Sequence, residues 1–135
     1  MTAISDLERL LSELSPRLLE GDWVFCSIDG SEARLTAALM PLALATFRED
    51  EGLSLLLPVS VAREHALGYE GLFRGITLDV HSSLAAVGLT AAVARSLADA
   101  GISANVIAAT NHDHVFVPSA ESGRALELLR RLSQV

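Results

Sequence analysis

The stretch that most constrains the fold is residues 76–117, where a strand pattern, a helix pattern and two further strand patterns follow one another. Apolar residues open it at every second position, which is the period of a half-buried strand: Ile76, Leu78 and Val80. The apolar residues that come next share one face of a helix: Leu89, Val93, Leu97 and Ala100. Gly101 then stands where a helix C-terminal cap belongs.

Two more strands and a helix complete the second half of the chain. Residues 102–108 alternate between apolar and other side chains, residues 110–113 read as a turn, and residues 115–117 read as a short strand. Pro118 ends that strand, and a last helix runs to Leu132. The order strand–helix–strand–strand–helix is most of a βαββαβ unit, so it predicts an α+β sandwich with helices on one face of a mostly antiparallel sheet.

Several residues in this stretch resemble an ACT domain, the small-molecule-sensing βαββαβ module of amino-acid metabolism. They are the loop Ser82-Ser83-Leu84 before Val87-Gly88, the helix end Ala100-Gly101-Ile102-Ser103, the strand Asn105-Val106-Ile107 and the pair Asp113-His114. The resemblance is strongest to short bacterial proteins made of two ACT-like halves. It extends more distantly to the regulatory domains of aspartate kinases and to the ACT domains of arginine sensors. It implies a ferredoxin-like fold.

The first half repeats part of this order. A helix is expected over 5–14, with Ser5 and Glu8 at capping-box spacing, and strands over 22–28, 43–48 and 53–57. A short helix follows over 59–67, whereas residues 31–42 fit either a helical turn or a variable loop. We therefore expect two incomplete ACT-like halves, an N-terminal one over 1–70 and a C-terminal ACT domain over 71–135.

The second half lacks the final strand of a βαββαβ unit, because its last helix runs almost to residue 135. That strand lies at a sheet edge, and an unpaired edge is prone to pair with other chains. We therefore expect a strand from the first half, or from another subunit, to cover it.

Composition excludes several kinds of partner. The chain has 17 acidic and 10 basic residues, a net charge of −7, no lysine and few aromatic residues. This charge opposes binding to nucleic acid or to an anionic membrane, and few aromatics disfavour a stacking surface for bases. No apolar run is long enough to cross a bilayer, the N-terminus lacks the features of a secretory signal, and Cys26 has no disulfide partner. A cytoplasmic protein is expected.

The candidate ligand site is the loop between the strand at 76–80 and the helix. Unpaired N–H groups at a helix N-terminus suit a carboxylate, although Ser82 and Ser83 could equally do no more than cap the helix. Gly88, taken to lie inside the helix, marks either a close ligand or tight packing against the sheet. The resemblance implies ligand-binding residues on both elements: His81, Ser82, Ser83, Leu84, Val87, Gly88, Asn105, Val106, Ile107 and Ala108. Asp113 could accept a hydrogen bond from a ligand amine or guanidinium, or from its own backbone.

Signals for catalysis or metal binding are weak. His112 and His114 could share a strand face, but no carboxylate or cysteine stands at a metal-ligand spacing, and Cys26 lies in an apolar strand. No nucleophile or nucleotide-binding motif occurs. We expect no catalytic residue, metal or cofactor. The function that fits is a non-catalytic ACT-type regulator or sensor, a homodimer that binds an amino acid or similar small metabolite. The alternative is a structural or protein-interaction module that uses its sheet edge.

Overall fold

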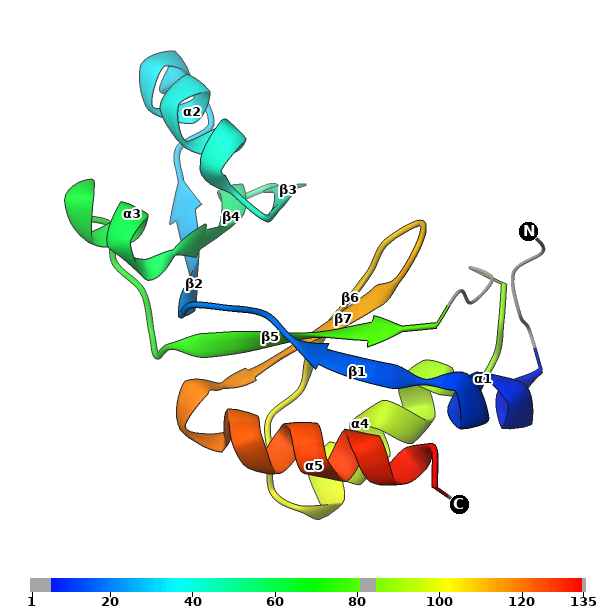
Figure 1. Ribbon diagram of the computed structural model, residues 1–135. Coiled ribbons are helices and arrows are strands. Elements are labelled where there is room, and N and C mark those ends of the chain that lie inside the picture. Colours follow the sequence, from blue (N-terminus) through cyan, green and yellow to red (C-terminus); the bar gives the residue numbers. More distant parts are fainter. Residues whose placement is uncertain (1–5, 81–84, 135) are drawn as a thin grey trace. The chain divides into compact units, whose positions relative to one another are not determined.

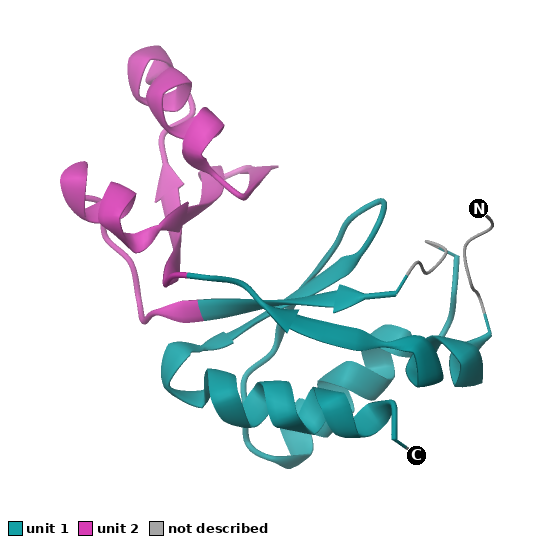
Figure 2. Ribbon diagram, viewed as in Figure 1, with its two compact units in different colours: residues 1–20, 74–135 teal, residues 21–73 magenta. Residues whose placement is uncertain are grey.

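The computed structural model describes residues 6–80 and 85–134 of the chain. It divides into two compact units, shown in different colours in Figure 2: unit 1 comprises residues 1–20 and 74–135, and unit 2 comprises residues 21–73. Both units consist of antiparallel strand pairs with helices, as the α+β prediction requires. The two ACT-like halves that the sequence predicts, residues 1–70 and 71–135, are repeats along the chain and not these compact units. Their boundary stays a prediction.

The described residues of unit 1 form four strands and three helices (Figure 1). In chain order they are α1 (Leu7–Glu13), β1 (Ser15–Leu18), β5 (Phe73–Asp79, whose first residue falls in unit 2), α4 (Leu89–Asp99), β6 (Asn105–Ala108), β7 (Asp113–Pro118) and α5 (Ser122–Leu132), with a 3-10 turn η2 (Ser119–Glu121) before α5. The strand order is β1-β5-β7-β6, and α4 and α5 cover one face of the sheet. This is the ferredoxin-like arrangement that the sequence predicts.

β1 lies at the edge of the unit 1 sheet, next to β5. It pairs antiparallel with β5, from Ser15 opposite Asp79 to Leu18 opposite Ile76. The expectation that a strand from the first half covers this edge is confirmed. Proline has no backbone N–H to donate, and it is tolerated at Pro16 because β1 is an edge strand.

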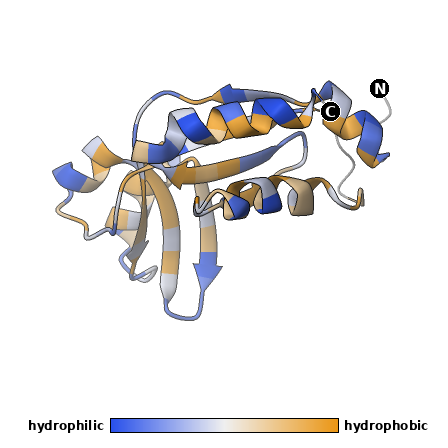
Figure 3. Ribbon diagram, turned by 90° about the horizontal axis from the view of Figure 1, so that it is seen from below, coloured by the Kyte–Doolittle hydropathy of each residue, from blue (hydrophilic) through white to orange (hydrophobic). Residues whose placement is uncertain are grey.

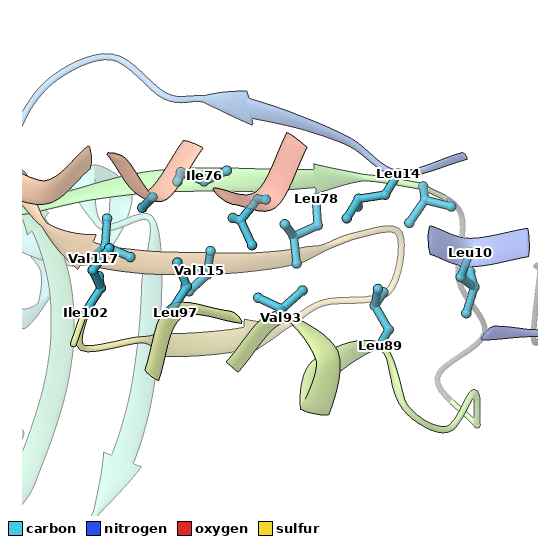
Figure 4. Packing of buried hydrophobic residues seen from close by; sticks show 13 residues of the cluster. Leu10, Leu14, Ile76, Leu78, Leu89, Val93, Leu97, Ile102, Val115 and Val117 are labelled. Atoms are coloured by element: carbon cyan, nitrogen blue, oxygen red, sulfur yellow. The ribbon is translucent and has the colours of Figure 1, made fainter. Parts of the chain in front are cut away.

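The core of unit 1 lies between the sheet and its helices (Figure 4). Its members are fully or almost fully buried and come from α1 and its C-cap, β5, α4, β7 and α5: Leu10, Leu14, Ile76, Leu78, Leu89, Val93, Leu97, Val115, Val117, Ala125 and Leu129. The apolar periods at 76–80 and 89–97 therefore point inward as predicted. Hydrophilic and hydrophobic residues follow one another along α5 (Figure 3), and Ala125 and Leu129 are buried, as expected of a helix with one buried face.

Unit 2 contains three strands and two helices, β2 (Trp23–Ile28), α2 (Ala33–Leu39), β3 (Ala45–Glu49), β4 (Gly52–Pro58) and α3 (Val59–Glu64), all within the described part of the chain. A 3-10 turn, η1 (Met40–Leu42), carries Pro41 and ends α2, so the ambiguous segment 31–42 is mainly helical. The strand order is β3-β4-β2, with both pairs antiparallel. A second core joins the inward side chains of β2 and β4 to the two helices: Val24, Cys26, Ile28, Leu39, Leu53, Leu55, Leu57 and Ala62.

Two details of the predicted helices are wrong, and both concern how a helix begins. α4 begins at Leu89, so Gly88 is its N-cap rather than an interior residue, with φ of 106° in the left-handed region. A side chain there would force strain, which is why glycine suits the position. For α1, Asp6 caps the helix by accepting a hydrogen bond from the Arg9 N–H at 3.1 Å. Ser5, the predicted cap, lies outside the described residues.

The predicted end of α4 is confirmed. Gly101 has φ of 75°, its N–H bonds the carbonyl of Ala98, and the N–H of Ile102 bonds that of Leu97. These bonds satisfy the last carbonyls of the helix. No helix in the described part of the chain is long and apolar enough to span a bilayer, since α4 and α5 have eleven residues each.

Candidate functional site

The predicted ligand loop is only partly within the described residues. His81, Ser82, Ser83 and Leu84 lie outside them, so their place in a site stays a prediction. Val87 follows with 82% of its surface exposed, and Gly88 is the N-cap of α4. A β-carbon built on Gly88 would lie 2.9 Å from Cδ2 of Leu7, so α1 approaches this position closely.

The predicted residues on β6 and β7 lie on two faces of the sheet. Val106 pairs with Val115 and packs against the core under the helices. Ala108 pairs with Asp113, and each lies two residues along its strand from Val106 or Val115. Because side chains alternate along a strand, Ala108 and Asp113 share the face of Val106 and Val115. Asn105 and Ile107 belong to the opposite face, and Nδ2 of Asn105 donates to the carbonyl of Phe116 at 3.1 Å. A ligand on one face of the sheet therefore meets at most one of these two sets.

The opposite face of the unit 1 sheet carries a polar cluster that the sequence analysis did not assemble. Nε of Arg17 donates to Oδ2 of Asp79 at 2.9 Å, and Nε2 of His112 lies 3.8 Å from Oδ1 of the same carboxylate. Oγ1 of the buried Thr77 is 3.0 Å from Nδ1 of His114. These side chains come from three strands and one turn, so strand alternation alone could not have grouped them. Within the described residues, no group of three or more His, Cys, Asp or Glu side chains is arranged to hold a metal ion.

Burial shifts the protonation of two side chains near this cluster. The pKa of His114 is lowered from 6.5, first by burial and then by the neighbouring His112. The pKa of Asp113 is raised from 3.8 by burial, against the opposing effect of His114. Both shifts favour the neutral form, because a partly buried side chain loses hydration of its charge.

Unit 2 contains a pocket of about 660 Å³ at its own strand–loop–helix junction. The pocket lies between the loop after β2, α2, β3 and the turn before β4, and its lining includes Asp29, Thr36, Met40, Thr46, Arg48, Glu49, Asp50 and Glu51. Oγ1 of Thr36 is buried and has no hydrogen-bond partner among the described residues, whereas Glu49 already accepts from the Ser54 hydroxyl.

Sequence reasoning missed this pocket because its lining comes from segments up to about twenty residues apart. One signal was available, since Asp29-Gly30 joins a strand to a helix just as residues 81–84 precede α4. Asp29 accepts hydrogen bonds from the N–H and hydroxyl of Ser31, which lower the pKa of its carboxyl group. It is therefore ionised at neutral pH.

Two segments of the chain match sequence families of small-molecule-binding regulatory modules. Residues 2–74 and residues 73–131 each match an ACT domain family, so the two matches together span almost the whole chain. The chain belongs to the ACT domain family. Domains of this family are in general regulatory, bind small ligands and are not catalytic. No sequence among the curated proteins matches the chain significantly.

Solved structures agree with the family. A Vibrio cholerae protein of unknown function, described as a possible transport protein, is 47% identical over 95% of this chain and 96% of that one, with a TM-score of 0.84. A protein from Agrobacterium tumefaciens has 18% identity, covers 89% of each chain and has a TM-score of 0.71. The ligand-free regulatory subunit of aspartate kinase from Thermus thermophilus has 13% identity, with 88% of this chain and 98% of that chain covered and a TM-score of 0.64. The last two likenesses concern the fold alone.

Proposed function

We propose that this protein is a non-catalytic ACT-type sensor that binds an amino acid or a similar small metabolite at a strand–loop–helix junction. The observation that carries the proposal is the coincidence of a tandem ACT match with a pocket at the junction of β2 and α2. The corresponding junction of the second half, from His81 to Gly88, is the other candidate site. Residues on β6 and β7 would complete it, either Asn105 and Ile107 or Val106, Ala108 and Asp113.

The unit 2 pocket offers complementary groups to a zwitterion. The guanidinium of Arg48 suits a carboxylate, and the carboxylates of Asp50 and Glu51 suit an ammonium group. The buried hydroxyl of Thr36 supplies a further donor or acceptor whose burial makes a bond to it worth more than on the surface. Met40 lines the same space and favours an apolar side chain on the ligand.

The first test is thermal unfolding of the full chain in the presence of each standard amino acid and common precursors. A ligand at about a hundred times its Kd adds about 2.7 kcal/mol, which is several degrees for a chain of this size. Arg48→Gln should remove the shift if the unit 2 pocket binds the ligand. Arg34→Gln is the matched control, because Arg34 is exposed on α2 and does not line the pocket.

The outcomes separate the two candidate sites. A shift that survives Arg48→Gln but disappears on Asn105→Ala or Asp113→Asn would place the ligand in the second half. No shift at millimolar concentrations of any of these ligands would contradict the sensor proposal.

A second candidate function is pairing through a sheet edge, and one observation favours it. β3 is an edge strand of unit 2, and its Phe47 is 72% exposed. An exposed edge with an aromatic side chain is a template for another chain. Light scattering would give the mass in solution, where we expect the homodimer, and Thr46→Pro should return the protein to the monomer if β3 is the contact. The lone thiol of Cys26 accords with the cytoplasmic location that we propose.

A further inference from the structure

Aromatic side chains are scarce in this chain, and half of them line one pocket. The sequence has four phenylalanines, one tryptophan and one tyrosine. A pocket of about 540 Å³ in unit 2 is lined by Phe25, Tyr69 and Phe73, together with Gly68 and Glu70. It is distinct from the pocket at the β2–α2 junction, because the two share no lining residue.

Two of the rings form a corner. Their centroids are 5.2 Å apart and their planes meet at 85°, so Phe25 and Phe73 make perpendicular walls. Phe25 belongs to the exposed positions of β2, which alternate with the buried Val24 and Cys26, and 40% of its surface is exposed. Phe73 pairs across the strands with Trp23. The strand register therefore places both rings on the face of the sheet away from α2 and α3.

The third wall comes from the segment between α3 and β5. Its turn passes through Gly71 in the left-handed region, with φ of 72°, and brings Tyr69 and Glu70 to the pocket. The Tyr69 hydroxyl accepts a hydrogen bond from Nε of Arg63 at 3.2 Å. The Tyr69 side chain also packs against the unit 2 core, so it lines the pocket from a fixed position.

The pocket combines the two features that attract an organic cation. Aromatic rings carry negative potential on their faces, and a cation over a ring face is attracted to it. Glu70 adds a carboxylate to the same lining, and the chain as a whole has a net charge of −7. Arg63 is the opposing charge nearby, but its contact is with the edge of Tyr69 at the hydroxyl.

We propose that the pocket of Phe25, Tyr69, Glu70 and Phe73 binds an alkylated ammonium ion, such as a quaternary ammonium head group. A metal ion is disfavoured, because one carboxylate among three rings supplies too few oxygen ligands. A neutral hydrocarbon would leave Glu70 without a role. An ammonium ion with methyl groups suits both the rings and the carboxylate of Glu70, since its surface is apolar and its charge is positive.

The test compares two probes of nearly equal shape that differ in charge. Choline carries a quaternary nitrogen, and 3,3-dimethylbutan-1-ol carries a carbon atom in its place. Binding to the full chain would be followed by the fluorescence of Trp23, the single tryptophan, which lies opposite Phe73, with sodium chloride adjusted to keep ionic strength constant. We expect choline to bind about tenfold or more tightly than the neutral alcohol.

Two variants assign the binding to the pocket. Phe25→Leu keeps an apolar side chain but removes a ring, and it should weaken choline about tenfold while the neutral alcohol changes little. Glu70→Gln should weaken choline several-fold with no effect on the alcohol. Glu64→Gln is the matched control, because Glu64 is an exposed acid at the end of α3 and does not line the pocket.

Several results would overturn the proposal. They are the absence of choline binding, equal affinity for the two probes, and choline affinity unchanged in both Phe25→Leu and Glu70→Gln. Phe25 and Glu70 are both exposed, so these variants should fold, and circular dichroism would verify that they do. The result is independent of the amino-acid screen, since Arg48 does not line this pocket.

Discussion

The guanidinium of Arg17 and the carboxylate of Asp79 meet at 2.9 Å, although 62 positions separate the two residues in the chain. The contact joins β1 to β5 near the end of their ladder, where Ser15 pairs with Asp79 and Arg17 with Thr77. His112 approaches the second oxygen of the same carboxylate at 3.8 Å. Asp79 therefore links the edge strand to the start of β7.

Arg17→Gln should weaken the attachment of β1 by a modest amount. The Arg17 side chain is 58% exposed and that of Asp79 is 34% exposed, so solvent screens much of the attraction. We expect a loss of about 0.5–1 kcal/mol in the free energy of unfolding, measured by urea denaturation. The control is Arg9→Gln, whose partner Glu13 is four residues away on α1 at 3.5 Å. A double-mutant cycle with Asp79→Asn that gives no coupling energy would contradict the prediction.

Gly88→Ala should destabilise the protein. A side chain at φ of 106° is strained, and its β-carbon would crowd Cδ2 of Leu7. We expect a cost of about 1–3 kcal/mol, measured by denaturant or thermal unfolding. Gly123→Ala is the matched control, because Gly123 lies in α5 and a β-carbon added to it would have no described atom within 4 Å. That substitution should stabilise the protein by about 0.4–1 kcal/mol. The idea fails if both substitutions have the same sign.

The stability of the fold should fall as the pH is lowered from neutral through about 6.5, the ordinary pKa of histidine. Since the pKa of His114 is lowered in the folded state, the unfolded chain takes up the proton first and gains free energy from it. The charged groups around His114 are His112, Asp113, Arg17 and Asp79. His114→Gln should therefore reduce the slope of unfolding free energy between pH 7.5 and 5.5, and an unchanged slope would refute this explanation.

Titration of the Asp113 carboxyl changes the stability with the opposite sign. Its pKa is raised, so the folded chain holds that proton more tightly and loses stability as the pH rises above 3.8. Its contribution to the dependence of stability on pH therefore opposes that of His114.

Cys26 should react slowly with thiol reagents in the folded protein. Its side chain is 5% exposed, and burial raises the pKa of the thiol, so little thiolate is present at neutral pH. We expect a colorimetric disulfide reagent to label the thiol of the native protein only as fast as the protein unfolds. In urea, labelling should be as fast as that of a free thiol. Labelling of the native protein as fast as a free cysteine peptide would contradict the structure.

The sequence predicts those helices and strands whose apolar residues repeat with the period of the element and face the core. Leu89, Val93 and Leu97 recur at helical spacing, and they are buried in α4 as expected. β1 had no such signal, because Ser15-Pro16 also reads as a helix terminator and the strand is only four residues long. It becomes a strand because the edge of β5 offers hydrogen-bonding partners, and those partners run from Ile76 to Asp79, far away in the sequence.

The candidate sites were harder to predict for the same reason. The loop before α4 could be chosen from its polar residues, but the pockets in unit 2 depend on which strand faces meet. Phe25 and Phe73 are 48 positions apart by number and form a right-angled corner only once β2 has paired with its neighbours. For Gly88, the residue type alone did not predict its position relative to the helix, because glycine occurs in helix interiors, caps and turns.

The place of β1 also sets an order of events during synthesis. Residues 21–73 form a unit that is contiguous in the chain, so all of its strands are translated before β7 and α5. Residues 15–18 emerge earlier still, yet their hydrogen-bonding partner is β5, which is translated more than fifty residues later. The nascent chain must therefore keep an unpaired edge segment available while unit 2 folds, and long-range pairing of this kind is slow. The sheet of unit 1 can therefore be completed only after β5, β6 and β7 have been translated.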